Sequence, residues 1–280
     1  MLQEAKKIAR KHKAGTAALL IVVTIIVVAV LAPLFAPNDP YSYDIQRRFE
    51  APSEDYPAGT DNMGRCVLSR VIWGARISLQ VGLVAVIIGS ILGLIMGVVA
   101  GFSGGVVETV IMRIVDIGLS FPFILLALLI TTFFGVGLGN VMIAVGIARA
   151  PRMARVAHAA TRQVRETEYI EASRSVGAPS ITIMVRHVLP NIMAPVLVRA
   201  TLDIAIAILA EASLSFLGLG ITPPTPTWGG IIAVGREHLR RAPWIATAPG
   251  MAIFATVLSM NVLGDGVRDY LDPKVGVSSR

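Results

Sequence analysis

Two carboxylates inside an apolar stretch are the first candidates for chemistry in this sequence. Asp203 and Glu211 lie within residues 192–217, eight positions apart, a spacing that places both on one face of a helix. Acidic groups in such surroundings are costly and often functional, so the pair could line a substrate path or carry protons. A polar contact with another helix explains the pair equally well. The same two interpretations apply to Asp116, close to Arg113.

Other reactive residue types lack the neighbours that catalysis or metal binding requires. His158 and His187 have no further metal-ligating residues at useful spacing, and Cys66 is the single cysteine, so we expect no metal site and no intramolecular disulfide. The sequence contains no GxSxG or HExxH pattern and no GxxxxGKS/T phosphate loop. We therefore expect no catalytic residues in this chain and no ATP hydrolysis by the chain alone.

The polar residues 164–190 predict a helical hairpin. Gly177 is placed to end a first helix in a left-handed conformation, and Pro179 prevents simple continuation of that helix. A second helix is expected from about Ser180 up to Pro190, because a proline disfavours helix at the residue before it. The result would be two short helices with a sharp bend between them.

Each predicted hairpin helix has apolar residues at helical spacing. These positions are Tyr169, Ala172 and Val176 in the first helix and Ile181, Met184, Val185 and Val188 in the second. One interpretation is an interfacial loop that lies on lipid headgroups. Because the first helix also carries acidic residues, which anionic headgroups would repel, we favour a surface that docks another protein.

Composition indicates what must position these residues. Of the 280 residues 54% are hydrophobic and 15% charged, whereas soluble proteins carry about 25% charged residues. The mean hydropathy of +0.70 requires lipid contact. The net charge of +7 comes with only 6% aromatic residues, and the basic residues flank apolar runs, which argues against nucleic-acid binding.

Apolar runs of about 20 residues predict six transmembrane helices in an all-α polytopic membrane protein. The predicted spans are residues 17–35, 77–101, 107–134, 141 to beyond 151, 192–217 and 245–263. Between residues 149 and 190 lie seven arginines against three acids, so the positive-inside rule places this stretch and both termini in the cytoplasm. Three arginines in the predicted external loop 218–243 are an exception to the rule: Arg236, Arg240 and Arg241.

Four segments follow from this topology. Residues 1–36 are a cytoplasmic tail and first transmembrane helix, which we interpret as an uncleaved anchor rather than a signal peptide. Residues 37–75 form an external loop with a short amphipathic segment near residues 67–73. The core is 76–270, and a cytoplasmic tail follows at 271–280.

The hairpin sequence resembles the EAA loop of ABC importer permeases. The residues that match the family pattern are Glu171, Ala172, Gly177, Leu189 and Pro190. Ser173 replaces the second alanine of the pattern and His187 occupies its isoleucine position. The ending from His187 to Asn191 is typical of the peptide/nickel branch of these permeases.

Further blocks along almost the whole chain are similar to the same branch. They are Gly59-Thr60-Asp61 with Gly64-Arg65 and Leu68-Ser69-Arg70, the run from Glu211 to Gly220, Trp228-Gly229, and Gly264-Asp265-Gly266 with Arg268, Asp269, Leu271, Asp272 and Pro273. Cys66 stands where the branch usually has an aspartate, which puts the role of a carboxylate there in doubt. Taken together, the blocks resemble the "C" subunit of dipeptide and oligopeptide permeases.

The resemblance implies a type I ABC importer permease with the MetI-like fold and cytoplasmic coupling helices, in a bacterial plasma (inner) membrane. Such a permease forms half of the pore with a homologous "B" subunit, above ATPase subunits that bind ATP and Mg²⁺, and an extracytoplasmic binding protein delivers the substrate. Residues implied to couple to the ATPase are Tyr169, Glu171, Ala172, Ser173, Gly177, Ala178, Arg186, His187, Leu189 and Pro190. Closure of the ATPases would then switch the pore between its two access states.

One rival function stays open at this stage. A secondary transporter could move protons or ions through Asp203 and Glu211, but such a protein would need no ATPase and would leave the polar hairpin unexplained. The substrate is open as well, because dipeptides, longer peptides, glutathione, nickel complexes and opines all use this branch.

Overall fold

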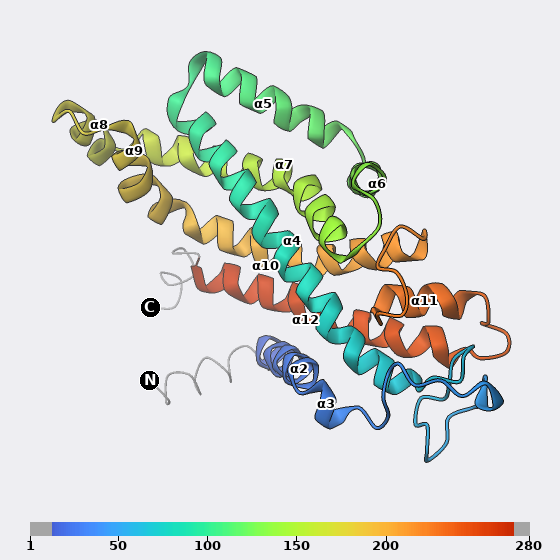
Figure 1. Ribbon diagram of the computed structural model, residues 1–280. Coiled ribbons are helices and arrows are strands. Elements are labelled where there is room, and N and C mark those ends of the chain that lie inside the picture. The colour runs from blue at the N-terminus through green and yellow to red at the C-terminus, as the bar shows by residue number, and fades with distance from the viewer. Residues whose placement is uncertain (1–12, 272–280) are drawn as a thin grey trace.

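The fold is a bundle of long helices joined by short turns at one end and by longer loops at the other (Figure 1). The computed structural model describes residues 13–271, so the predictions for residues 1–12 and 272–280, Asp272 and Pro273 included, lie outside the described residues. Within this range no strand occurs, only an isolated bridge between Thr60 and Cys66. The α-helices are α2 (Lys13–Val30), α3 (Ala32–Phe35), α4 (Val67–Ser103), α5 (Gly105–Ser120), α6 (Phe123–Phe134), α7 (Leu138–Arg165), α8 (Glu168–Ser175), α9 (Ser180–Ile183), α10 (Leu189–Phe216), α11 (Trp228–Arg236) and α12 (Trp244–Leu271).

Apolar helices long enough to cross a bilayer make this a multi-pass membrane protein. Three helices of the described range qualify by length and composition, namely α4, α12 and the continuous helix from Ser180 to Phe216. The bent pair of α5 and α6 adds a fourth candidate. The segment 14–30 of α2 is apolar but shorter, and α7 is long but rich in arginine. The number of six spans therefore stays a prediction.

The predicted span at residues 107–134 is sharply bent. Helices α5 and α6 meet at an angle of 97°. The bend lies at Phe121 and Pro122, where Phe121 adopts an extended backbone (ψ 137°). A proline restricts the residue before it to this conformation and has no N–H for a helix hydrogen bond, so the apolar run continues while the helix direction changes.

Two predicted loop segments are also partly helical. Residues 67–73, expected as a separate lead-in, are the first turns of α4, which extends without interruption to Ser103. Helix α11 lies within the predicted external loop 218–243. Thr227 caps this helix by accepting a hydrogen bond from the Gly230 N–H, and the Trp228 indole donates to the Val71 carbonyl at 2.9 Å.

Helices α4 and α7 approach each other closely along the α4–α7 seam, which we define by Gly89, Gly93 and Gly97 of α4 against the facing backbone of α7. A Cβ at Gly93 would lie 2.6 Å from the Ala150 carbonyl oxygen, and one at Gly97 would lie 2.5 Å from that of Ala154. Spacing of four residues places the glycines on one helix stripe, the arrangement that allows helix backbones to approach in lipid. The seam fixes α7, and α7 leads into the hairpin.

The second hairpin helix does not end at Pro190, contrary to the prediction. Helix α9, a π-helical turn at Met184–Val188 and α10 form one continuous helix, hereafter the rod (Ser180–Phe216). In the π-helical turn the Leu189 N–H donates to the Met184 carbonyl, five residues back. This wider turn changes the hydrogen-bond register just before the proline, whose missing N–H and bulky ring would otherwise disrupt an α-helix.

Candidate functional site

The hairpin is held against the bundle by buried apolar side chains and two arginines. Ile170 of α8 is fully buried and belongs to a cluster with Phe102, Ile183 and Val188. The Arg165 guanidinium donates to the Gly101 carbonyl at 3.3 Å. The Arg174 guanidinium lies 4.7 Å from the centroid of the Phe102 ring, a cation–π contact. The hairpin therefore packs on the last turn of α4.

The apolar stripes identified in the hairpin sequence are largely exposed. Val176 is 84% exposed, Ile181 63% and Val185 55%. The buried side chains are Val188 from these stripes, together with Ile170 and Ile183, which lie outside them. Each short helix carries apolar side chains on two faces, one that packs on the bundle and one that does not. Periodicity alone could not tell which face is which. The result is an exposed apolar surface on the hairpin.

The ten residues predicted to couple to an ATPase all lie on this hairpin, and none is fully buried. The exposed ones are Tyr169, Glu171, Ala172, Gly177, Arg186 and Pro190, and the half-buried ones are Ser173, Ala178, His187 and Leu189. Gly177 has φ +78°, as its predicted left-handed cap requires. Within residues 13–271, the side chains of Glu171 and Arg186 have no ion-pair partner within 4.0 Å.

Glu211 is enclosed by hydroxyl groups rather than by charges. Its side chain is fully buried; Ser215 donates to one carboxyl oxygen at 2.8 Å and Ser78 donates to the other at 3.4 Å. The Ser78 hydroxyl also accepts from the backbone N–H of Trp228 at 3.2 Å. Glu211 thus connects α10 to α4 and to the start of α11 within this chain.

Asp203 has a different environment, although it lies on the same helix face as Glu211. Its carboxylate forms ion pairs with Arg149 of α7 and with Arg199 one turn earlier on the rod, the latter at 2.9 Å. The Arg149 guanidinium also lies 5.0 Å from the Phe123 ring centroid. Sequence reasoning found Asp203 but not its partners. The i,i+4 spacing of Arg199 was a usable signal, whereas Arg149 is too distant in sequence to have given one.

Two further polar contacts join α5 to α7. Asp116 pairs with Arg155, and both side chains are about half exposed. The imidazole of His158 lies 2.7 Å from a Glu108 carboxyl oxygen. The residues described contain no group of three or more histidine, cysteine or acidic side chains that could hold a metal ion. Asp116 and His158 therefore have helix-contact geometry.

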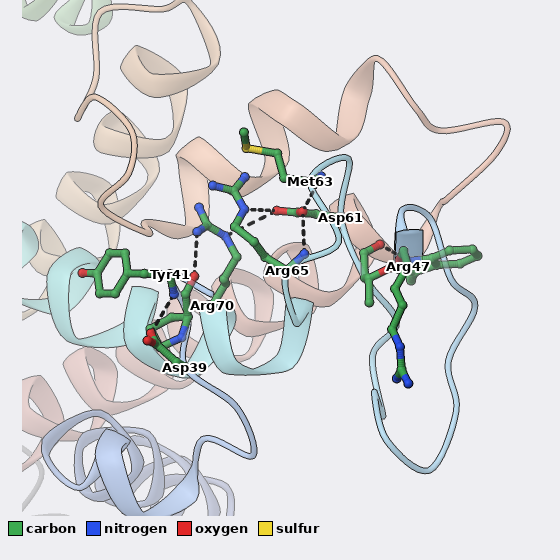
Figure 2. Close-up of polar contacts among 10 residues, drawn as sticks. Asp39, Tyr41, Arg47, Asp61, Met63, Arg65 and Arg70 are labelled. Carbon is green, nitrogen blue, oxygen red and sulfur yellow. Dashed lines mark hydrogen bonds and ion pairs between the residues drawn. The ribbon is translucent and has the colours of Figure 1, made fainter. Parts of the chain in front are cut away.

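At the opposite end of the bundle, Asp61 organises the loop before α4 (Figure 2). Its carboxylate accepts from the Arg65 Nε at 2.7 Å and from the Met63 N–H at 2.8 Å, and it lies 3.7 Å from the Arg70 Nε. Arg70 donates in turn to the Pro40 carbonyl at 3.0 Å. The Gly-Thr-Asp block therefore has a structural explanation: it ties residues 37–66 to the first turn of α4.

Cys66 lies next to this network as the N-cap of α4. Its side chain is buried and forms no capping hydrogen bond. Aspartate is among the best N-cap residues because its carboxylate accepts from the first free N–H groups of a helix. An aspartate at this position in other permeases would thus act as a helix cap, a role that needs no contact with substrate.

Comparison with known proteins decides which family these features represent. Residues 69–277 match the model of the binding-protein-dependent transport system inner membrane component, and residues 1–52 match the N-terminal TM domain of oligopeptide transport permease C. The first match covers more than half of the chain. The chain belongs to this family of transport permeases. It is the permease component of an ABC importer, a membrane component and not an enzyme.

Named relatives and solved structures agree with this assignment. The permease is 45% identical over 271 residues to the glutathione transport system permease protein GsiD of Shigella flexneri, a match that covers 96% of this chain and 89% of that protein. It is 41% identical over 265 residues to a putative peptide transport system permease protein of Brucella abortus, covering 95% and 89%. The MetNI methionine ABC transporter in an inward-facing conformation shares its fold, with a TM-score of 0.60 at 21% identity, covering 72% of this chain and 96% of that one.

Proposed function

We propose that this permease forms half of the translocation pore of an importer for peptides, and that its hairpin, residues 164–190, binds a partner ATPase. The observation that carries the proposal is the outer surface of the hairpin. This surface includes the exposed side chains of Glu171 and Arg186, which form no ion pair within residues 13–271, and the exposed apolar side chains of Val176 and Ile181. A surface of this composition is suited to a protein partner, because contiguous exposed apolar groups are unfavourable in water and charges add specificity.

The rod gives this surface a mechanical connection to the pore. Because Ser180 and Phe216 belong to one continuous helix, a displacement of the hairpin moves α10 with it. Helix α10 carries Asp203 and Glu211, which pair with α7 and α4 respectively. We infer that closure of the ATPases, which bind ATP and Mg²⁺, changes the access of the pore through this helix.

Topology supports the same orientation. The described end of α12 lies beside the start of α10, which continues from the hairpin, because Leu271 lines a groove with Ala194 and Pro195, as expected if the carboxyl terminus is in the cytoplasm. The exceptional arginines at the other end are bound to the protein: Arg236 donates to the Phe216 carbonyl at 3.1 Å, and the Arg241 guanidinium lies 4.4 Å from the Phe49 ring centroid. Such fixed charges are compatible with an external loop of a bacterial inner-membrane protein.

The remaining partners follow from the family. We propose a homologous "B" permease subunit for the other half of the pore, one or two kinds of ATPase subunit, and an extracytoplasmic binding protein that delivers substrate. Relatives named for peptide and for glutathione transport favour a peptide-class substrate. An ion-coupled transporter is disfavoured, because both of its proposed carboxylates are engaged in contacts between helices.

A charge reversal tests the docking surface. We expect Glu171→Arg to reduce the amount of ATPase that co-purifies with the permease at least about tenfold, since removing one partner of a charge pair at an interface costs about 2–5 kcal/mol. Glu54→Arg is the matched control, because Glu54 is exposed in the loop at the opposite end of the bundle. Transport-coupled ATP hydrolysis should fall in the first variant only. Equal co-purification and equal hydrolysis in the two variants would remove the hairpin from the interface.

A further inference from the structure

The ion cluster around Asp203 contains more positive charge than it can neutralise. One carboxylate faces two guanidinium groups, those of Arg149 and Arg199, and Arg152 adds a third like charge near both. The Arg149 side chain is 2% exposed and that of Asp203 3%. Arg149 and Asp203 are buried and balance each other, whereas Arg199 is partly exposed and Arg152 exposed, so the excess positive charge lies toward the surface and favours the binding of a second anion there.

The hydrogen-bonding state of the cluster leads to the same conclusion. Neither ion pair has the geometry of a hydrogen bond. Nη2 of each arginine is the atom that pairs with the Asp203 carboxylate, whereas Nε of each is buried without a hydrogen-bond partner among the described residues. Guanidinium N–H groups form a planar fork that suits a carboxylate. Because Arg199 contacts Asp203 through Nη2, its Nε remains a donor for another carboxylate once the side chain turns.

A groove brings a ligand within reach of one of these arginines. It has a volume of about 360 Å³ and lies between α7, α10 and α12, where Arg199 and Arg268 are its charged lining residues among apolar ones such as Pro195 and Leu202. Arg199 is 24% exposed, whereas Arg149 is closed off. Pockets of this size, mostly apolar with a few polar groups, are typical of small-molecule sites.

The cluster also allows Arg199 to leave Asp203 at low cost. Removing the partner of a buried charge is normally destabilising by several kcal/mol because the other charge is left alone. Here Asp203 keeps its ion pair with Arg149 when Arg199 turns toward the groove. We propose that Arg199 exchanges between Asp203 and the carboxylate of a peptide substrate, so that the groove is an intramembrane carboxylate-binding site on the substrate path.

The proposal rests on the proposed peptide-transport function and adds the chemical group that is recognised. Arg199 lies on the rod about nine residues beyond Pro190, or roughly 14 Å along the helix at 1.5 Å per residue. Movement of the hairpin would thus displace Arg199 relative to Arg268 of α12. This displacement would let the site bind substrate in one access state and release it in the other.

Binding to the assembled complex tests the site without ATP and without the binding protein. The probes are radiolabelled dialanine and dialanine amide, which differ in the carboxylate, with the complex in phosphatidylcholine nanodiscs. We expect the parent complex to bind dialanine about tenfold more tightly than the amide, and Arg199→Gln to lose this preference. The matched control Arg113→Gln should keep it, because Arg113 is exposed on α5 and has no ion pair among the described residues.

A second variant predicts a change of opposite sign. Asp203→Asn removes the carboxylate that competes for Arg199, so dialanine should bind about tenfold more tightly than to the parent complex. A merely structural role for the cluster predicts weaker binding instead. If Asp203→Asn fails to assemble, the comparison of Arg199→Gln with Arg113→Gln still decides the matter.

Several results would overturn the site. One is equal binding of acid and amide by the parent complex, or no binding of either at about 10 mM, which is weaker than any useful affinity. Another is loss of dialanine binding when phosphatidylglycerol is added to the nanodiscs, which would identify the groove as a lipid-phosphate site. The binding assay contains no ATPase step, so a negative result in it does not contradict the docking proposal. Conversely, if the ATPase fails to co-purify with Glu171→Arg, the preference for the carboxylate can still be measured.

Discussion

The α4–α7 seam and the hairpin each require a glycine, at Gly93 and Gly177 respectively, but for different physical reasons. Gly93 has an ordinary helical backbone, but a Cβ there would lie 2.6 Å from the Ala150 carbonyl oxygen. Gly177 has φ +78°, and a Cβ there would meet nothing within 4 Å. The seam needs glycine for space, whereas the hairpin needs it for backbone conformation. One region is built for close packing and the other for a fixed bend at an exposed surface.

The largest effect is expected in the seam. Gly93→Val would place methyl groups against the backbone of α7, which cannot move aside as a flexible side chain could, and we expect a loss of about 3 kcal/mol of folding stability. The measurement is the thermal unfolding and the yield of the purified complex.

The matched control for the seam is Gly139→Val. Gly139 lies in the first turn of α7, with ordinary backbone angles and nothing within 4 Å of an added Cβ. Because valine has a better helix propensity than glycine, this variant should be as stable as the parent. If Gly93→Val were equally stable, the close approach of α4 and α7 would not determine stability.

The bend of the hairpin could be predicted from the sequence, whereas the helix that packs against α4 in the seam could not. A glycine two residues before Pro179 was sufficient to place the bend, because left-handed caps are a local property. Gly89, Gly93 and Gly97 have a spacing that is typical of close helix packing in lipid, but nothing local in the sequence identifies α7 as the opposite helix. Arg149 escaped prediction for the same reason, since it is 54 residues from Asp203 and on another helix.

Errors in the prediction also have physical causes. An apolar run does not reveal a change of direction, so the bend at Pro122 was missed. Pro190 was expected to end a helix because the accommodating π-helical turn has no sequence signature of its own. On the hairpin, the apolar stripe identified in the sequence contained the exposed Val176 and left out the buried Ile170, because a segment with one internal and one external apolar face gives an ambiguous pattern.

An intermediate effect is expected at the bend. Gly177→Val forces a β-branched residue into the left-handed region, which costs about 1–2 kcal/mol, and the strain is relieved by changing the angle between α8 and the rod. We expect a near-normal thermal unfolding but ATP hydrolysis that no longer depends on transport. Gly177→Asn is the control, since asparagine tolerates φ above zero. Normal transport in the valine variant would show that the bend angle is not transmitted.

The smallest effect is expected at Ser173, where this hairpin departs from the pattern of related loops. The Ser173 hydroxyl donates to the Tyr169 carbonyl at 2.7 Å, a bond to a carbonyl one turn earlier in the same helix. Such a bond competes weakly with the helix and adds little stability, while alanine has the higher helix propensity by about 0.5 kcal/mol. Ser173→Ala should therefore leave ATPase co-purification unchanged and raise the helicity of α8 slightly, which hydrogen exchange of the α8 amides would detect as slower exchange. Because Ser173 is half-buried and uncharged, a clear loss of ATPase binding would mean that its hydroxyl contacts the partner directly. The docking surface would then extend from Glu171 to the side of α8 that faces the bundle.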